Sequence, residues 1–185
     1  MSRALSLPVF AGLALLLAGC PDTRPVDAVD VERYLGLWYE IASYPAPFQA
    51  GCVATTAEYG ATDAADVISV VNRCRLDDFD GPEDVIEGTA RITDDSGAKL
   101  SVSFGEGFGG AFGVGAPYWI IELDAAPGPA PYRWAVVSEP TANFLWILSR
   151  TPTLDDATYA EIRRRLDARR FDLDRLRETP QPPAL

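Results

Sequence analysis

Short runs of β-branched and aromatic residues alternate with turn-forming residues along most of the chain. Each run is bounded by Gly, Pro, Asp or Asn, a pattern that favours strands over helices. The expected strands are residues 37–44, 52–59, 67–74, 85–93, 99–104, 118–124, 132–138 and 144–150. Because no helix separates them, the pattern predicts an antiparallel up-and-down arrangement. Eight such strands close into a β-barrel that is wide enough for one small ligand.

One amphipathic helix is predicted after the last strand. The segment Thr153-Leu-Asp-Asp156 is similar to a capping box, and Tyr159, Ile162 and Leu166 recur at helical spacing. Five arginines lie on this helix or at its end: Arg163, Arg164, Arg165, Arg169 and Arg170. We interpret them as a solvated face and as partners of the helix dipole, in preference to a binding patch.

The N-terminal residues are typical of an export signal. Arg3 precedes an apolar stretch, residues 4–17, that is too short to span a membrane as a helix. This stretch ends in Leu17-Ala-Gly-Cys20, which resembles the lipobox of bacterial lipoproteins, in which the cysteine is acylated and cleavage occurs before it. An ordinary signal peptide with a chance cysteine is the alternative. An aspartate directly after the acylated cysteine is associated with retention in the inner membrane. Pro21 occupies that position here, so we expect anchoring in the outer membrane, on its periplasmic side.

These features divide the chain into four parts. We predict a lipoprotein signal peptide at residues 1–19, a lipidated Cys20 with an extended tether at 20–30, one domain at 31–180 and a tail at 181–185.

The two remaining cysteines are expected to form a disulfide, because an exported protein meets oxidising conditions. The second and third strands are predicted to form a hairpin around the turn-like residues 60–66. If the turn centres on residue 63, Tyr59 pairs with Val67 and Cys52 lies directly opposite Cys74. Opposed residues are close enough for a disulfide. A pair of free redox or metal-binding thiols is the alternative, but neither a Cys-x-x-Cys spacing nor further ligands accompany it.

Composition narrows the function classes. The 185 residues are 48% apolar and 23% charged, which suits one soluble globular domain. The net charge of −11 makes nucleic acid a poor partner. The sequence contains no histidine, which excludes Ser-His-Asp nucleophiles and His-ligated zinc or haem. We expect no metal and no cofactor.

Two motifs resemble those of one family. Gly36-Leu-Trp38-Tyr-Glu-Ile-Ala42 is similar to the G-x-W signature of lipocalins, and Leu145 to Pro152 is similar to their last-strand motif. Cys52 and residues 72–74, 102–104 and 132–137 also resemble the bacterial outer-membrane lipoprotein lipocalins, relatives of apolipoprotein D. The similarity covers residues 31–180. It implies an eight-stranded calyx with the C-terminal helix packed outside, whose base is held structurally by Gly36, Trp38 and Arg150.

Strand alternation suggests which side chains face the interior. If Arg150 meets Trp38 at the base, then Trp146 and Leu148 face inward, and so do Glu40, Ala42 and Tyr44. A carboxyl group in an apolar barrel needs an arginine or hydroxyl partner, or stays protonated. The predicted ligand-binding residues are Glu40, Tyr44, Phe48, Phe104, Tyr118, Ile120, Trp134, Trp146 and Leu148, with Phe108 and Phe112 as further candidates for the mouth.

Residues 105–110 satisfy the pattern G-x-G-x-x-G, but no helix or βαβ unit accompanies them. We therefore interpret them as a flexible turn and not as a dinucleotide site. Residues 124–131 form a similarly expanded hairpin loop, so the identity of the lipid does not follow from the family.

The sequence thus predicts a lipid-anchored lipocalin, a monomer or weak homodimer, that holds a fatty acid, lysophospholipid or similar amphiphile by burial. Storage, transport or membrane maintenance under stress is implied by the resemblance. One alternative is a lipocalin-fold enzyme that uses Glu40, Glu122 or a tyrosine of the cavity as its acid or base. The other is a structural or assembly protein whose barrel is filled by its own side chains.

Overall fold

The computed structural model describes residues 19–105, 115–124 and 126–183. The predicted signal peptide, apart from its last residue, lies outside these ranges, as do Phe108, Phe112 and the glycine motif beyond Gly105. No helix in the described ranges is long and apolar enough to cross a membrane.

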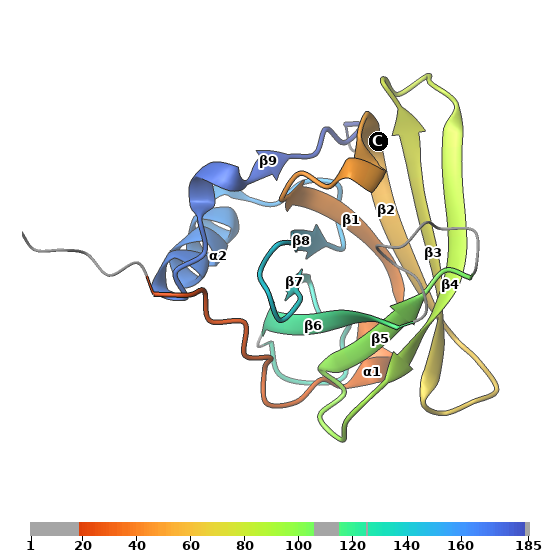
Figure 1. Cartoon of the computed structure of the whole chain (residues 1–185), viewed down its shortest axis with the longest axis vertical. Helices are drawn as coiled ribbons and strands as arrows, with labels where there is room; N and C mark the ends of the chain where they lie inside the picture. The colour runs from red at the N-terminus through yellow and green to blue at the C-terminus, as the bar shows by residue number, and fades with distance from the viewer. Residues whose placement is uncertain (1–18, 106–114, 125, 184–185) are drawn as a thin grey trace, which may run out of the picture.

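Eight antiparallel strands form a closed barrel (Figure 1). Each strand pairs with its neighbour in the sequence, and β1 closes the barrel by pairing with both β2 and β8. The strands are β1 (Gly36–Ser43), β2 (Cys52–Ala61), β3 (Val67–Leu76), β4 (Glu83–Ile92), β5 (Lys99–Ser103), β6 (Ala116–Leu123), β7 (Trp134–Ser138) and β8 (Leu145–Ser149). The predicted fold and strand count are confirmed.

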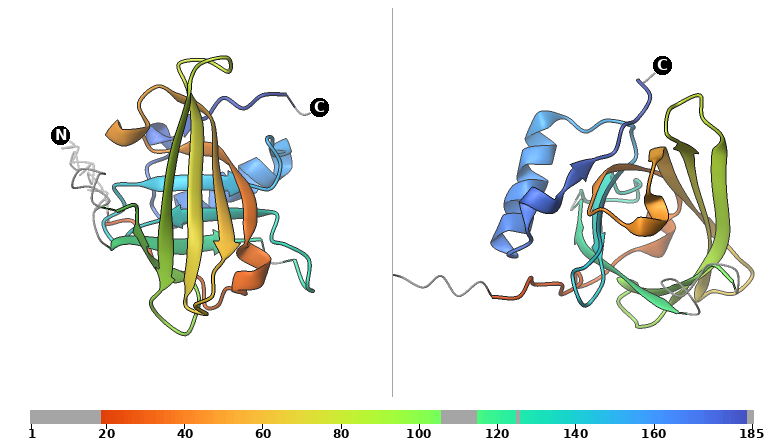
Figure 2. Two further views of the ribbon diagram at one scale, coloured as in Figure 1. Left: turned by 90° about the vertical axis from the view of Figure 1, so that its right-hand side faces the viewer. Right: turned by 45° about the horizontal axis from the view of Figure 1, so that its top comes forward.

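The helix α2 (Asp156–Ala168) lies outside the barrel (Figure 2). The predicted capping box at Thr153 is wrong by two residues. Asp155 is the N-cap instead, and its side chain accepts a hydrogen bond from the Thr158 amide. Asp at this position satisfies a free amide of the first turn, so the helix begins where that carboxylate is available.

Four short elements were not predicted. These are α1 (Val31–Tyr34), the 3-10 turns η1 (Pro47–Gln49) and η2 (Leu173–Arg175), and the edge strand β9 (Arg177–Glu178). The strand β9 pairs with the end of β1. Each element is too short to show a hydrophobic period.

The predicted register of the β2–β3 hairpin is wrong. Tyr59 lies opposite Val70, and Cys52 lies opposite Leu76. The turn is centred later than expected because β2 continues to Ala61, and a bulge between Val53 and Thr56 shifts the pairing again. The predicted disulfide between Cys52 and Cys74 is nevertheless present, because the two Cα atoms are 5.4 Å apart and so within the range that a disulfide spans.

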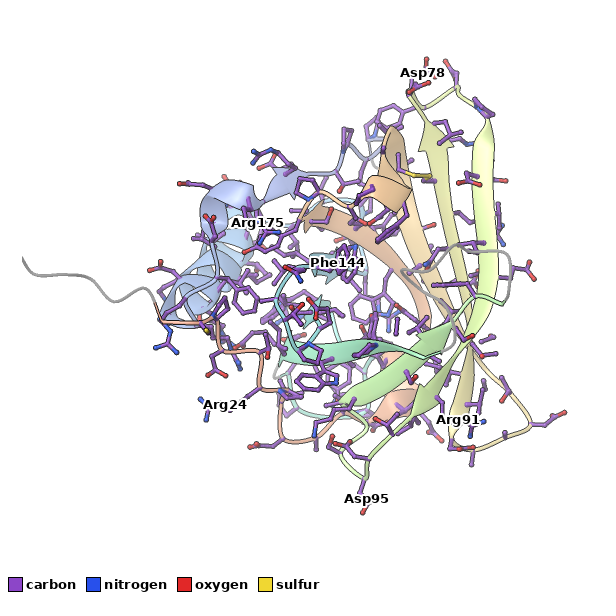
Figure 3. The ribbon with its side chains drawn as sticks, in the orientation of Figure 1. Arg24, Asp78, Arg91, Asp95, Phe144 and Arg175 are labelled. Atoms are coloured by element: carbon purple, nitrogen blue, oxygen red, sulfur yellow. A yellow bond between two sulfur atoms is a disulfide. The ribbon has the colours of Figure 1, made fainter. Side chains whose placement is uncertain are left out.

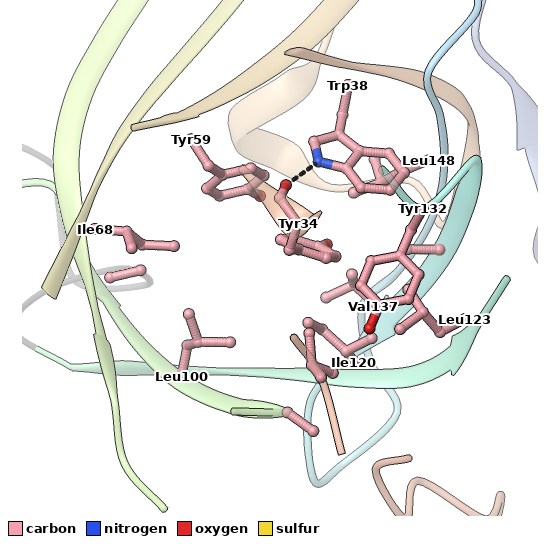
Figure 4. Packing of buried hydrophobic residues seen from close by; sticks show 14 of the residues in the cluster. Tyr34, Trp38, Tyr59, Ile68, Leu100, Ile120, Leu123, Tyr132, Val137 and Leu148 are labelled. Carbon is pink, nitrogen blue, oxygen red and sulfur yellow. Dashed lines mark hydrogen bonds between the residues drawn. The ribbon is translucent and has the colours of Figure 1, made fainter. Parts of the chain in front are cut away.

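Apolar side chains gather in two layers. The inner cluster lies within the barrel and includes Tyr34, Trp38, Tyr59, Ile120 and Leu148 (Figure 4). The outer cluster lies between the barrel wall and α2. The helix contributes the buried side chains of Ile162 and Leu166 to this cluster. The barrel wall is therefore apolar on both faces where α2 covers it.

Two bulges change which side chains face inward. In β1 the register shifts between Glu40 and Ala42, so Trp38 belongs to the inner cluster and Ala42 to the outer one. In β6 the register shifts between Ile120 and Glu122. An inserted residue reverses the alternation beyond it.

Candidate functional site

A cavity lies inside the barrel, between the inner cluster and the end that carries the β1–β2 connection. Its volume is about 130 Å³, measured as the space open to the centre of a water molecule. Most of its wall is apolar or aromatic: Phe48, Ala57, Tyr59, Val70, Ile86, Val102, Phe104, Tyr118, Trp146 and Leu148 line it. One water needs only about 10–15 Å³ on this measure. The described side chains therefore do not fill the barrel.

Six of the nine predicted ligand-binding residues line this cavity. They are Glu40, Phe48, Phe104, Tyr118, Trp146 and Leu148. Three polar residues that were not predicted also line the cavity: Gln49, Thr55 and Asn72. Asn72 carried a signal that could have found it, because it alternates with Val70 and Cys74, which are both buried.

Tyr44, Ile120 and Trp134 do not line the cavity, which corrects their prediction. Tyr44 belongs to the outer cluster, where its hydroxyl donates to the Asp172 carbonyl. The β1 bulge turns it outward. Trp134 also faces α2, where Arg165 lies 5.4 Å from its ring centroid. Ile120 faces inward but is buried in the inner cluster below the open space.

Glu40 is only 5% exposed and has two side-chain partners. Its Oε1 accepts a hydrogen bond from the Thr179 hydroxyl at 2.6 Å, and its Oε2 accepts one from Gln49 Nε2 at 2.8 Å. Gln49 Oε1 in turn accepts a hydrogen bond from Trp146 Nε1 at 2.9 Å. The expectation of a hydroxyl partner is confirmed. These bonds fix the carboxyl group and the indole in the cavity wall.

The C-terminal segment completes this wall. The pairing of β1 with β2 covers only residues 36–39 of β1, and beyond it the two strands are bridged by residues 179–181. The Thr179 amide donates to the Ile41 carbonyl, and the Pro180 carbonyl accepts from the Ala54 amide. Gln181 Nε2 donates to the main-chain carbonyls of both Glu40 and Thr55, each at 2.9 Å.

Three aromatic rings lie together at the open end. Phe144 stacks on Trp146 with 5.9 Å between ring centroids and an interplanar angle of 15°, and its ring is 5.6 Å from that of Phe48. Phe144 immediately precedes β8 (Figure 3). Apolar rings at this position favour an apolar molecule that enters the barrel.

Three tyrosines, of which Tyr34 and Tyr59 are buried and Tyr118 is half-buried, share hydrogen bonds at the other end of the cavity. The Tyr118 hydroxyl lies 2.8 Å from the hydroxyls of both Tyr34 and Tyr59. Burial raises the pKa of Tyr59 to about 12, and burial likewise raises the pKa values of Tyr34 and Tyr118. All three side chains are therefore neutral phenols at neutral pH.

Glu122 lies outside the barrel, because the β6 bulge turns it outward. Its carboxylate pairs with Arg169 at 2.6 Å and with Arg165 at 3.1 Å. Arg165 and Arg169 are thus held in a partly buried ion-pair network, which corrects their interpretation as a purely solvated face. Among the described residues, no group of Cys, Asp and Glu side chains is arranged to hold a metal ion.

The segment after Cys20 packs against this network instead of extending freely as a tether. Arg169 Nη1 donates to the carbonyls of Asp22 and Arg24, and the Asp22 amide donates to the Arg169 carbonyl. The Val26 amide donates to the carbonyl of Ile120 in β6. Cys20 itself is exposed.

Comparison with known proteins agrees with this architecture. The family described as "Lipocalin-like domain" matches residues 29–181. The outer membrane lipoprotein Blc of Citrobacter freundii is 36% identical over 187 residues, which cover 96% of this chain and 98% of that protein. The temperature-induced lipocalin-1 of Arabidopsis thaliana is 34% identical over 164 residues, which cover 86% of this chain and 83% of that protein.

Among solved structures, insecticyanin from the tobacco hornworm Manduca sexta superimposes with a TM-score of 0.67 at 22% identity, covering 89% of this chain and 87% of that one. This likeness shows the fold. The matched family and the two relatives establish that the chain belongs to the lipocalin family.

Proposed function

We propose that this lipocalin holds one single-chain lipid amphiphile, such as a fatty acid or a lysophospholipid, with its hydrocarbon tail in the barrel cavity. The observation that carries the proposal is the open, largely apolar space between the tyrosine cluster and the aromatic end. Burial of apolar surface contributes about 25 cal/mol per Å². Burying a few hundred Å² of acyl-chain surface thus contributes several kcal/mol. Part of this is offset because the bound ligand loses translational and rotational freedom, and the remainder supports micromolar affinity.

The proposed role is binding without catalysis. Of the acid–base groups considered for an enzyme, Glu122 is paired with arginines outside the barrel. Glu40 accepts hydrogen bonds from Gln49 and Thr179, and the tyrosines of the cavity are neutral. None of these groups is an activated nucleophile or a free base.

We further propose that Cys20 carries the lipid anchor and that the protein faces the periplasm from the outer membrane. Two observations support this location: Cys20 is exposed, and the relative from Citrobacter freundii is an outer membrane lipoprotein by name. The anchor keeps the cavity near membrane lipids, which suits storage, transport or membrane maintenance under stress. Mass spectrometry of the protein extracted from membranes tests the lipid anchor. A mature chain that begins at an acylated Cys20 is expected, and an unmodified Cys20 contradicts the anchor.

Native mass spectrometry of protein purified from membranes tests the binding function. One lipid per protein chain is expected. Ala57→Phe places a ring into the cavity, so it is expected to remove the bound lipid. Ala61→Phe is the matched control, because Ala61 is exposed at the end of the same strand. A wild-type protein that carries no lipid and takes none from vesicles contradicts the proposal and favours a structural or assembly role.

A further inference from the structure

The polar part of the cavity wall is rich in hydrogen-bond acceptors. Glu40 and Thr55 line it from neighbouring strands, and the single amide of Gln181 holds their main chains together. Asn72 lines the cavity from β3. On the adjacent strand, Asp84 lies opposite Cys74 and so shares the inward face of the sheet.

Two of these side chains have unused polar atoms. Thr55 is only 8% exposed, and its Oγ1 is buried without a hydrogen-bond partner in the described part of the chain. The Oδ1 atom of Asn72 is likewise buried without a hydrogen-bond partner among the described residues. Buried polar atoms in folded proteins nearly always have a partner, since leaving one unpaired is unfavourable. Both residues line the cavity, so a ligand is positioned to supply the missing partner.

The charges that face this region are negative. Glu40 can accept more than the two hydrogen bonds it has, because a carboxylate offers about four acceptor sites. Arg73 is the one cation among the described cavity-lining residues. Arg73 lies between Asn72 and Cys74 along β3. Because successive side chains of a strand alternate, its side chain points to the face opposite that of Asn72 and Cys74.

We propose that this acceptor cluster, consisting of Glu40, Thr55, Asn72 and Asp84, selects amphiphiles whose polar end donates hydrogen bonds. The preferred ligand class is a single-chain lipid with a primary ammonium or a hydroxyl headgroup, and a free fatty-acid carboxylate is disfavoured. The proposal rests on the proposed function, because it names the headgroup of the lipid bound in the same cavity. An ammonium group has three donors and no acceptor, which complements this cluster, whereas a carboxylate only accepts.

Three ligands with the same twelve-carbon chain test the selection: dodecylammonium, monododecanoylglycerol and dodecanoate. Each competes with the fluorescent probe N-phenyl-1-naphthylamine at pH 7 on the purified protein. The ammonium and the glyceride are expected to bind at least about tenfold more tightly than dodecanoate, the size of one hydrogen bond to a charged group. Binding of dodecanoate that equals or exceeds both overturns the inference.

Variants separate local contacts from overall charge. Glu40→Gln is expected to reduce the preference for ammonium over dodecanoate about tenfold, with both affinities measured on the variant itself. Asp78→Asn is the matched control, because it removes one negative charge from the exposed tip of the β3–β4 hairpin (Figure 3). Equal effects of the two substitutions identify long-range charge as the cause and overturn the inference.

Thr55→Val keeps the shape of the side chain and removes the hydroxyl. It is expected to weaken both donor ligands several-fold and to weaken dodecanoate less, and it carries the test if Glu40→Gln does not fold. An unchanged affinity for both donor ligands overturns the role of Thr55. Failure of the probe and of all three ligands to bind wild-type protein refutes the proposed function itself, which is a distinguishable result.

Discussion

The guanidinium group of Arg150 lies over the indole ring of Trp38, with its central carbon 3.8 Å from the ring centroid. Its nitrogens also donate to the carbonyls of Arg33, Tyr34, Leu35 and Leu37, at 2.8–3.0 Å. These carbonyls belong to α1 and to the start of β1, so one side chain holds the base of the barrel closed. Burial lowers the pKa of Arg150, but the group stays charged because the usual value is far above neutral pH.

Arg150→Lys is therefore expected to lower the free energy of unfolding by about 2–3 kcal/mol. A lysine keeps the charge but does not reproduce the planar group that stacks and donates to several carbonyls. Urea denaturation measures the loss. Arg164→Lys is the control, since Arg164 is exposed and pairs only with Glu161, and its expected effect is below about 0.5 kcal/mol. Equal losses contradict the proposed role of Arg150.

The disulfide offers a second test of stability. Cys52 and Cys74 are 22 residues apart, and the chain-entropy relation for a loop of this length gives about 3 kcal/mol. The double substitution Cys52→Ala and Cys74→Ala is expected to lower the free energy of unfolding by this amount. The wild-type protein under reducing conditions should match the double variant, and Cys20→Ala should match the oxidised wild type. A reduced protein that is as stable as the oxidised one contradicts the prediction.

The barrel follows from the sequence because each strand carries its own local signal of apolar runs bounded by turn residues. Local alternation fails where a bulge adds one residue. The bulge after Glu40 turns Tyr44 from the expected interior to the outer cluster, and the bulge after Ile120 does the same to Glu122. Bulges have no compositional signature here, so the faces beyond them could not be predicted.

The polar contacts of the cavity depend on residues far apart in the chain. Thr179 reaches Glu40 across 139 positions, and its proline-rich surroundings indicate only an irregular tail. The aromatic residues were easier to predict, because an aromatic side chain inside a barrel lines whatever space is left there. Phe48, Phe104 and Trp146 were found in this way, whereas Gln49 and Thr55 were not.

The tyrosine cluster predicts loss of stability in alkali. Burial raises the pKa of Tyr59 from 10 to about 12, so between these values the unfolded chain has lost a proton that the folded protein retains. The free energy of unfolding therefore falls with rising pH in this window, and Tyr59 alone accounts for about 3 kcal/mol. Denaturant titrations from pH 8 to 12 measure the slope. Tyr59→Phe is expected to reduce that slope, and an unchanged slope contradicts the assignment.

The packing of the segment after Cys20 depends on Arg169. This side chain joins Glu122, on the outside of β6, to the carbonyls of Asp22 and Arg24. Arg169→Ala removes these donors and leaves Glu122, which is 13% exposed, with Arg165 as its remaining partner. The segment 22–26 is then expected to open more often from the barrel wall.

Hydrogen exchange at the amides of Asp22 and Val26 measures this opening, since both amides donate to carbonyls of the folded domain. Loss of about 1.5 kcal/mol of local stability raises their exchange rates about tenfold. Arg163→Ala is the matched control, because Arg163 lies on the same helix and faces the Tyr159 ring 5.8 Å away. Equal exchange in the two variants would mean that the segment is held without Arg169. Faster exchange only in Arg169→Ala would identify this arginine as a residue that holds the segment after Cys20 against the barrel and thereby limits how far an anchored domain can move from its membrane.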